Sequence, residues 1–232
     1  SLVGSEMCIR DSAEAVKQGR GIYDNIRKFI RYMLACNFGE VVTMFAGVLF
    51  GLPLPLYPIQ ILWVNLVTDG LPGIALGVDP VTDDIMNRKP VPADRGLFYG
   101  RMPFLILFRG LLIGLCTLGV FASIQYTTQN TELARTAAFM TLVMTQIVHS
   151  FECRSETKSL LQSGIRDNLW LLAAGALSIL MMLAVIYIPA LQTVFRTVPL
   201  EIEQMAVVAG FTAIGPILGA LVNDFLGHNP FS

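Results

Sequence analysis

Five oxygen-bearing side chains lie in two stretches of sequence that are otherwise apolar enough to cross a bilayer. Asn37 and Glu40 fall in the first stretch, and Asn65, Thr68 and Asp69 fall in the second. A carboxylate at membrane depth costs about 2.5–3.5 kcal/mol on insertion scales, so it usually marks an ion or proton path. Within each stretch the spacing is that of residues on one face of a helix. We therefore expect a cation site between two transmembrane helices.

The chemistry of this set favours a hard divalent cation. It offers two carboxylates, two amide carbonyls and a hydroxyl, with no thiolate or imidazole. Ca²⁺ takes 6–8 oxygen ligands in flexible geometry, whereas Zn²⁺ and Cu⁺ prefer nitrogen or sulfur; Mn²⁺ shares the preference for oxygen. Two acids without a basic partner at their depth either hold cations or are protonated. Gln146 is a further candidate ligand, or else a hydrogen-bonding link between helices.

A helix breaker follows the polar residues of the second stretch. Pro72, with Gly70 beside it, cannot donate a backbone hydrogen bond to the carbonyl of Thr68. Free carbonyls at membrane depth are tolerated where they line a cavity or bind something. Broken helices are where transporters hold their ions, so the breaker and the carboxylate of Asp69 coincide where a site would need them.

The composition requires a membrane to hold these helices. The chain has 232 residues, of which 54% are hydrophobic and 14% charged, against about 25% charged in soluble domains. A spanning helix needs about 20 apolar residues, and six segments qualify: residues 29–50, 58–76, 105–126, 137–151, 169–191 and 202–226. The fourth is the weakest, because it is short and polar. The sequence thus predicts an all-α membrane protein, a six-helix transmembrane bundle whose partner is the lipid bilayer and not nucleic acid.

The distribution of Lys and Arg predicts the orientation and the domains. Basic residues concentrate before the first span and in the loops after the second and fourth spans, so both termini are expected to be cytoplasmic. Residues 13–28 continue the first helix into the cytoplasm as a stalk, residues 29–226 form the transmembrane domain, and residues 227–232 form a cytoplasmic tail. Residues 1–12 resemble a translated sequencing adaptor and are expected to be non-native.

Other polar and small residues favour plain structural roles. We expect His149 and Glu152 to lie toward solvent at the cytoplasmic end of the fourth span. Gly210, Gly215 and Gly219 are expected to allow close helix approach in the last span. The cysteines form no CxxC pair and are interpreted as small apolar fillers; they are Cys8, Cys36, Cys116 and Cys153.

Three motifs carry a family resemblance: GRGIYDNIRKFIRYMLACNFGEVV, PIQILWVNLVTDGLPGIALGVDP and DDIMNRKP. Together they resemble the carboxy-terminal membrane half of a P-type cation-transporting ATPase, most closely the calcium pumps of the sarcoplasmic-reticulum type and their bacterial relatives. The resemblance covers about residues 13–226 and implies that the spans are helices five to ten of a ten-helix pump. It implies ligand roles for Asn37, Glu40, Asn65, Thr68 and Asp69. Gln146 stands where two-ion members carry a glutamate, which leaves transport of one Ca²⁺, or a weakened second site, open.

The resemblance also implies parts that this sequence does not contain. No Asp-Lys-Thr-Gly-Thr phosphorylation motif is present, so we expect no catalytic residue here and no activity from the chain alone. The expected partners are upstream phosphorylation, nucleotide-binding and actuator domains with the first four helices, through which ATP and Mg²⁺ would act. The loop at residues 79–92 would contact the phosphorylation domain or be an ordinary solvated loop. A bacterial plasma membrane is the expected location.

Three alternatives remain open on the residues. One is a gradient-driven secondary transporter that uses Glu40 and Asp69 as proton carriers. Another is a non-enzymatic membrane scaffold, in which neutralising either acid is harmless. The third is a P-type pump selective for Mn²⁺ or a monovalent cation.

Overall fold

The computed structural model describes residues 2–81, 83–87, 96–154 and 168–227, and throughout these ranges the regular structure is helical. The helices are α1 (Leu2–Leu49), α2 (Pro58–Trp63), the π-helical segment η1 (Val64–Thr68), α3 (Gly70–Gly77), the 3₁₀ helix η2 (Asp83–Asn87), α4 (Met102–Thr128), α5 (Thr131–Glu152), α6 (Leu169–Tyr187), α7 (Pro189–Phe195) and α8 (Ile202–Gly227). The all-α membrane class predicted from the sequence is confirmed.

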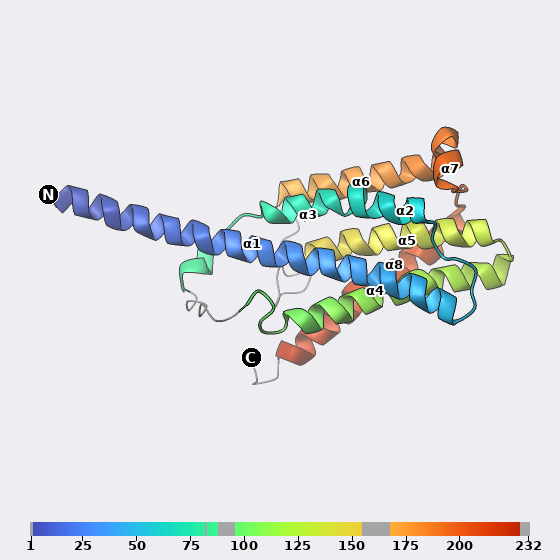
Figure 1. Cartoon of the computed structure of the whole chain (residues 1–232), viewed down its shortest axis with the longest axis horizontal. Coiled ribbons are helices and arrows are strands. Elements are labelled where there is room, and N and C mark those ends of the chain that lie inside the picture. Colours follow the sequence, from blue (N-terminus) through green and yellow to red (C-terminus); the bar gives the residue numbers. More distant parts are fainter. Residues whose placement is uncertain (1, 82, 88–95, 155–167, 228–232) are drawn as a thin grey trace.

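Helix α1 is much longer than a bilayer requires. It runs without interruption for 48 residues, and its first half projects beyond the bundle as a rod (Figure 1). The predicted stalk at residues 13–28 is thus continuous with the first span. The helix also extends back through residues 2–12, the segment expected to be non-native.

The second predicted span is broken in the structure, as Pro72 and Gly70 suggest, but the break takes a specific form. Helices α2 and α3 are joined by η1, in which the amide of Asp69 donates to the carbonyl of Val64, five residues back, at 2.8 Å. Helix α3 then begins at Gly70, which places Pro72 near its start. A proline in the first turn costs little, because its missing N–H would have no partner there.

Five helices of the described chain have the length and apolar composition to cross a membrane, at Ile9–Leu49, Pro58–Gly77, Met102–Thr128, Leu169–Tyr187 and Ile202–Val222. The fourth predicted span corresponds to α5, which is long but too polar to qualify. Helix α5 lies inside the bundle (Figure 1), and every residue from Ala134 to Val143 is buried. Because protein surrounds this helix, its polar side chains need not face lipid. The count of six spans stays a prediction.

Two details of the later spans differ from the expectation. The fifth span was expected to reach residue 191, but α6 ends at Tyr187 because Pro189 starts the separate short helix α7. In α8, a Cβ added to Gly210 or Gly215 would meet no atom of the described residues within 4 Å, so neither glycine is needed for close packing among the described helices. At Gly219 an added Cβ would collide with the guanidinium of Arg109.

Close helix packing instead occurs between α1 and α4. A Cβ on Gly110 would lie 2.8 Å from the carbonyl oxygen of Ala35, and one on Gly114 would lie 2.9 Å from that of Gly39. The two backbones approach because glycine leaves no side chain between them. This contact fixes α1, which carries Glu40, against the rest of the bundle.

Candidate cation site

Glu40 is held in the bundle interior by two amides from other helices. Its side chain is 5% exposed. Asn65 Nδ2 of η1 donates to Glu40 Oε2 at 2.6 Å, and Gln146 Nε2 of α5 donates to Glu40 Oε1 at 3.1 Å. Three of the predicted site residues, from three elements far apart in the sequence, therefore meet directly.

Asp69 is still more deeply buried, at 1% exposure. Its Oδ1 accepts a hydrogen bond from Tyr32 Oη of α1 at 3.1 Å, whereas its Oδ2 is buried without a hydrogen-bond partner. Sequence reasoning missed Tyr32. Its position on the same helix as Glu40, about two turns earlier, is the only signal that could have suggested it.

The π-helical segment explains how Thr68 is satisfied. The Thr68 hydroxyl donates to the carbonyl of Val64 at 3.1 Å. The Thr68 carbonyl, predicted to be freed by Pro72, accepts a hydrogen bond from Ser178 of α6 at 3.4 Å. The broken backbone is thus supported by a neighbouring helix, as irregular backbone at membrane depth must be.

Among the described residues, Asn37 is a predicted ligand that lies outside the buried cluster of Glu40, Asn65 and Gln146. It is exposed, on a stripe of α1 shared with Val41 and Phe45, which are 62% and 68% exposed. Three helical residues turn the chain through about 300°, so Asn37 and Glu40 point about 60° apart. That angle suffices to put Asn37 at the edge of the site while Glu40 faces inward.

Two oxygen atoms at the candidate site have no hydrogen-bond donor and are therefore available to a cation. Gln146 Oε1, like Asp69 Oδ2, is buried and accepts no hydrogen bond. A buried acceptor without a partner costs about 1–3 kcal/mol. Among the described residues no three His, Cys, Asp or Glu side chains gather as metal ligands would, so any cation held here depends on amide, hydroxyl or backbone oxygens besides the two carboxylates.

A second buried charge cluster lies where the rod of α1 meets the bundle. Asp79, just after α3, is 4% exposed and forms ion pairs with Lys28 at 2.6 Å and Arg154 at 3.1 Å. Asn168, the N-cap of α6, donates to the same carboxylate at 2.8 Å, and Asn25 of α1 donates to the Asp79 carbonyl, also at 2.8 Å. Asp79 therefore ties together α1, α3, α6 and the end of α5. It does not belong to a solvated loop, as its mixed-charge neighbourhood had suggested; residues 82 and 88–92 of that loop lie outside the described residues.

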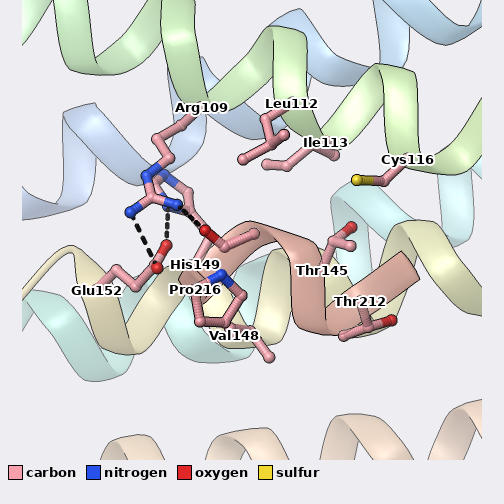
Figure 2. Close-up of a pocket in the computed structure, with 11 residues that line it drawn as sticks. Arg109, Leu112, Ile113, Cys116, Thr145, Val148, His149, Glu152, Thr212 and Pro216 are labelled. Carbon is pink, nitrogen blue, oxygen red and sulfur yellow. Dashed lines mark hydrogen bonds and ion pairs between the residues drawn. The ribbon is translucent and has the colours of Figure 1, made fainter. Parts of the chain in front are cut away.

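His149 and Glu152 are also not solvated, which corrects the expectation for the end of α5. Glu152 Oε1 forms an ion pair with Arg109 of α4 at 2.9 Å, and its Oε2 lies 3.3 Å from His149 Nδ1. Figure 2 shows the three side chains turned toward one another, and they line a pocket between α4, α5 and α8. Arg109 also donates to the carbonyl of Gly215 at 2.8 Å. The pairing of Arg109 with Glu152 could not be predicted from the sequence, because the two residues lie on different helices.

An all-α, multi-pass bundle with buried carboxylates beside a broken helix is the architecture of a membrane cation transporter. Residues 53–225 match the family model described as "Cation transporting ATPase, C-terminus", and the chain belongs to that family. The resemblance stated from the motifs is confirmed.

Curated relatives agree with this family. The chain is 48% identical over 205 residues to a "Calcium-transporting ATPase" of Bacillus subtilis (strain 168), which covers 88% of this chain and 23% of the relative. It is 42% identical to "Calcium-transporting ATPase 1" of Bacillus cereus (strain ATCC 10987 / NRS 248), over 92% of this chain and 25% of the relative. It is 35% identical to a "Probable calcium-transporting ATPase" of Trypanosoma brucei brucei, over 84% of this chain and 22% of the relative. The chain thus spans about a quarter of the length of these relatives.

Proposed function

We propose that the chain is the ion-binding membrane part of an ATP-driven pump that exports Ca²⁺, with Glu40 and Asp69 as its charged ligands. The observation that carries the proposal is the pair of buried, unpartnered acceptors at Asp69 Oδ2 and Gln146 Oε1. Gln146 Oε1 belongs to the cluster with Glu40 and Asn65, and Asp69 follows Asn65 by four residues on the broken helix. A divalent cation would satisfy both acceptors and balance both acids.

Asn65 and Gln146 would change roles when the cation binds. Both amides now donate to Glu40 through nitrogen. An amide carries a carbonyl oxygen on the same planar group, so rotation about its terminal bond exchanges a donor for an acceptor. Glu40 would then be released from the amides and compensated by the ion. Thr68 would contribute its hydroxyl or carbonyl from the π-helical segment beside Asp69.

We infer that upstream helices complete the site. The exposed stripe of α1 includes Leu34, Val41 and Phe45, which are 40%, 62% and 68% exposed, and Asn37 lies among them. The relatives have about three quarters of their length outside the matched region, which is room for further helices. Under this proposal Asn37 is a ligand at the seam between this chain and those helices.

The rest of the mechanism follows from the same proposal. ATP, with Mg²⁺, phosphorylates an upstream domain that contacts the rod of α1, and movement of the rod reaches Glu40 along one unbroken helix. The Asp79 cluster and the rod lie at the cytoplasmic end, and Arg135 and Arg196 at the opposite end; both termini are then cytoplasmic. The membrane is the bacterial plasma membrane. Membership in an ATPase family supports this reading over a gradient-driven transporter or a scaffold.

The test joins this chain to the upstream part of the Bacillus subtilis relative and measures Ca²⁺-dependent phosphoenzyme in inverted membrane vesicles. We expect Ca²⁺ activation in the parent chimaera and its loss in the Asp69→Asn, Asn65→Ala double variant. The control is Glu132→Gln, which also neutralises an acid but at an exposed position. It should leave Ca²⁺ activation intact. Retention of Ca²⁺ activation by the double variant would refute the site, and activation by Mn²⁺ alone would change the assigned ion.

A further inference from the structure

Cys153 immediately follows α5 and lies against a histidine. Its Sγ is 3.3 Å from His149 Nε2, and the residue is 1% exposed. The other ring nitrogen, His149 Nδ1, is 3.3 Å from Glu152 Oε2. Thiol, imidazole and carboxylate therefore form a continuous chain of contacts outside the candidate cation site.

This arrangement differs from that of a buried cysteine that merely fills space. A nucleophile within hydrogen-bond reach of a base, with the base oriented by a third group, is the general signature of an activated nucleophile. Here the third group is itself fixed, because Arg109 holds Glu152 by an ion pair at 2.9 Å. The imidazole is thus oriented with one nitrogen toward the carboxylate and the other toward sulfur.

The surroundings of the sulfur favour its anionic form. Burial opposes ionisation of the Cys153 thiol, but His149 and Arg31 outweigh it and lower the pKa of this thiol. Arg31 is anchored beside it through a 2.9 Å hydrogen bond to the Glu152 carbonyl. Reactive cysteines typically lie next to His, Lys or Arg in this way, although they are usually more exposed than Cys153.

We propose that Cys153 is a peroxide-sensitive modification site, in which His149 accepts the thiol proton and hydrogen peroxide is the oxidant. The thiolate sulfur attacks one peroxide oxygen and forms an S–O bond as the O–O bond breaks. The leaving hydroxide takes a proton from the imidazolium and departs as water. Sulfur loses two electrons and peroxide gains them, so thiol plus hydrogen peroxide gives sulfenic acid plus water.

Burial sets the class of reagent. A thiol that is 1% exposed excludes bulky oxidants such as glutathione disulfide, but hydrogen peroxide is close to water in size. His149 lines the pocket of Figure 2 together with residues of α4 and α8, Arg109 and Pro216 among them. This pocket is a route by which a water-sized molecule can arrive next to the imidazole.

Oxidation of Cys153 would disturb the packing next to the candidate cation site. The rings of His149 and Tyr32 have centroids 6.2 Å apart, and Tyr32 donates to Asp69. A sulfenic oxygen added to a packed thiol must displace its neighbours. This consequence depends on the proposed function, whereas the modification itself does not.

The experiment treats the same full-length chimaera in vesicles with hydrogen peroxide, then unfolds the protein in dimedone so that burial no longer limits the label, and quantifies the adduct on each cysteine by mass spectrometry. Cys36 is the internal control, since it is buried in the same apolar cluster as Cys153. We expect the Cys153 adduct to form about tenfold faster than the Cys36 adduct, because thiolates and not thiols react. Equal rates at the two cysteines would overturn the proposal, and this comparison needs no variant.

A variant separates the role of the histidine from mere access. His149→Gln retains a hydrogen-bonding side chain but not a base, and it should slow labelling of Cys153 while leaving Cys36 unchanged. Undiminished labelling of Cys153 in a folded His149→Gln protein would remove the imidazole from the proposal. Absence of a Cys153 adduct would overturn the modification proposal, whereas a Cys153 adduct in a chimaera without Ca²⁺ activation would count against the proposed function alone.

Discussion

Gln146 Nε2 of α5 donates to Glu40 Oε1 of α1 at 3.1 Å, across 106 residues of sequence. Asn65 holds the other oxygen of the same carboxylate. The acid is therefore clamped from two directions, by the innermost helix and by the π-helical segment. The amide nitrogen of Gln146 supports the Glu40 carboxylate when no cation is bound. The amide oxygen of the same side chain has no partner and is a candidate ligand.

Gln146→Ala should destabilise the protein most when no cation is bound. Glu40 Oε1 would lose its donor inside the bundle, at a cost of about 1–3 kcal/mol. We expect a lower midpoint of thermal denaturation in detergent with chelator, and a smaller loss with millimolar Ca²⁺. Gln18→Ala, at an exposed position of the rod, provides the control. An equal loss with and without Ca²⁺ would mean that Gln146 only links helices.

Tyr32→Phe should weaken cation binding without changing the shape of the core. The ring stays, but Asp69 Oδ1 loses its donor at 3.1 Å. Without this donor the carboxylate is held less firmly in the geometry that a cation needs. We expect the Ca²⁺ concentration for half-maximal phosphoenzyme formation to rise about tenfold, the equivalent of about 1.4 kcal/mol. Tyr126→Phe, at a residue that is 71% exposed, should have no effect; an unchanged Ca²⁺ dependence in Tyr32→Phe would contradict the prediction.

Asp79→Asn should lower stability more than a change to an ordinary surface acid. It leaves Lys28 and Arg154 without the carboxylate that both contact. The Asp79 carboxylate is 3% exposed, but both cations keep some contact with solvent, so we expect a loss of about 1–3 kcal/mol rather than the full cost of breaking a buried pair. Thermal denaturation measured by intrinsic fluorescence should show the loss, with Glu201→Gln, an exposed acid, as the comparison. Equal midpoints for the two variants would show that the Asp79 cluster is not a structural tie.

Gly219→Ala and Gly210→Ala form a matched pair on α8. An added Cβ at position 219 collides with the Arg109 guanidinium, whereas at position 210 it meets open space. Gly219→Ala should displace Arg109 from Glu152 and lower the denaturation midpoint. Gly210→Ala should be neutral or slightly stabilising, because alanine favours the helix by up to about 1 kcal/mol. The reverse order of the two midpoints would refute the packing described for Arg109.

A good part of the molecule could be predicted from sequence because membranes impose strong local rules. Apolar runs near Phe45 or Leu177 must be helices, since backbone polar groups have no other partner in lipid. The same rules mark Glu40 and Asp69 as exceptional, since a buried acid is too costly to be incidental. The place of the helix break follows from Pro72 in the same way. These inferences need only neighbours in the chain.

Only the tertiary structure decided which polar groups face each other. Spacing on one helix put Asn37 and Glu40 on a common side, but the angle between them and the packing of α4 leave Asn37 outside the cluster. Glu152 was predicted to lie toward solvent, but the packing of α4 against α5 pairs it with Arg109. Asp79 looked like a loop residue for the same reason. The sequence determines which polar and charged groups cannot be buried without a partner. The partner that offsets the cost of burial comes from another helix, so three-dimensional packing decides which residue it is.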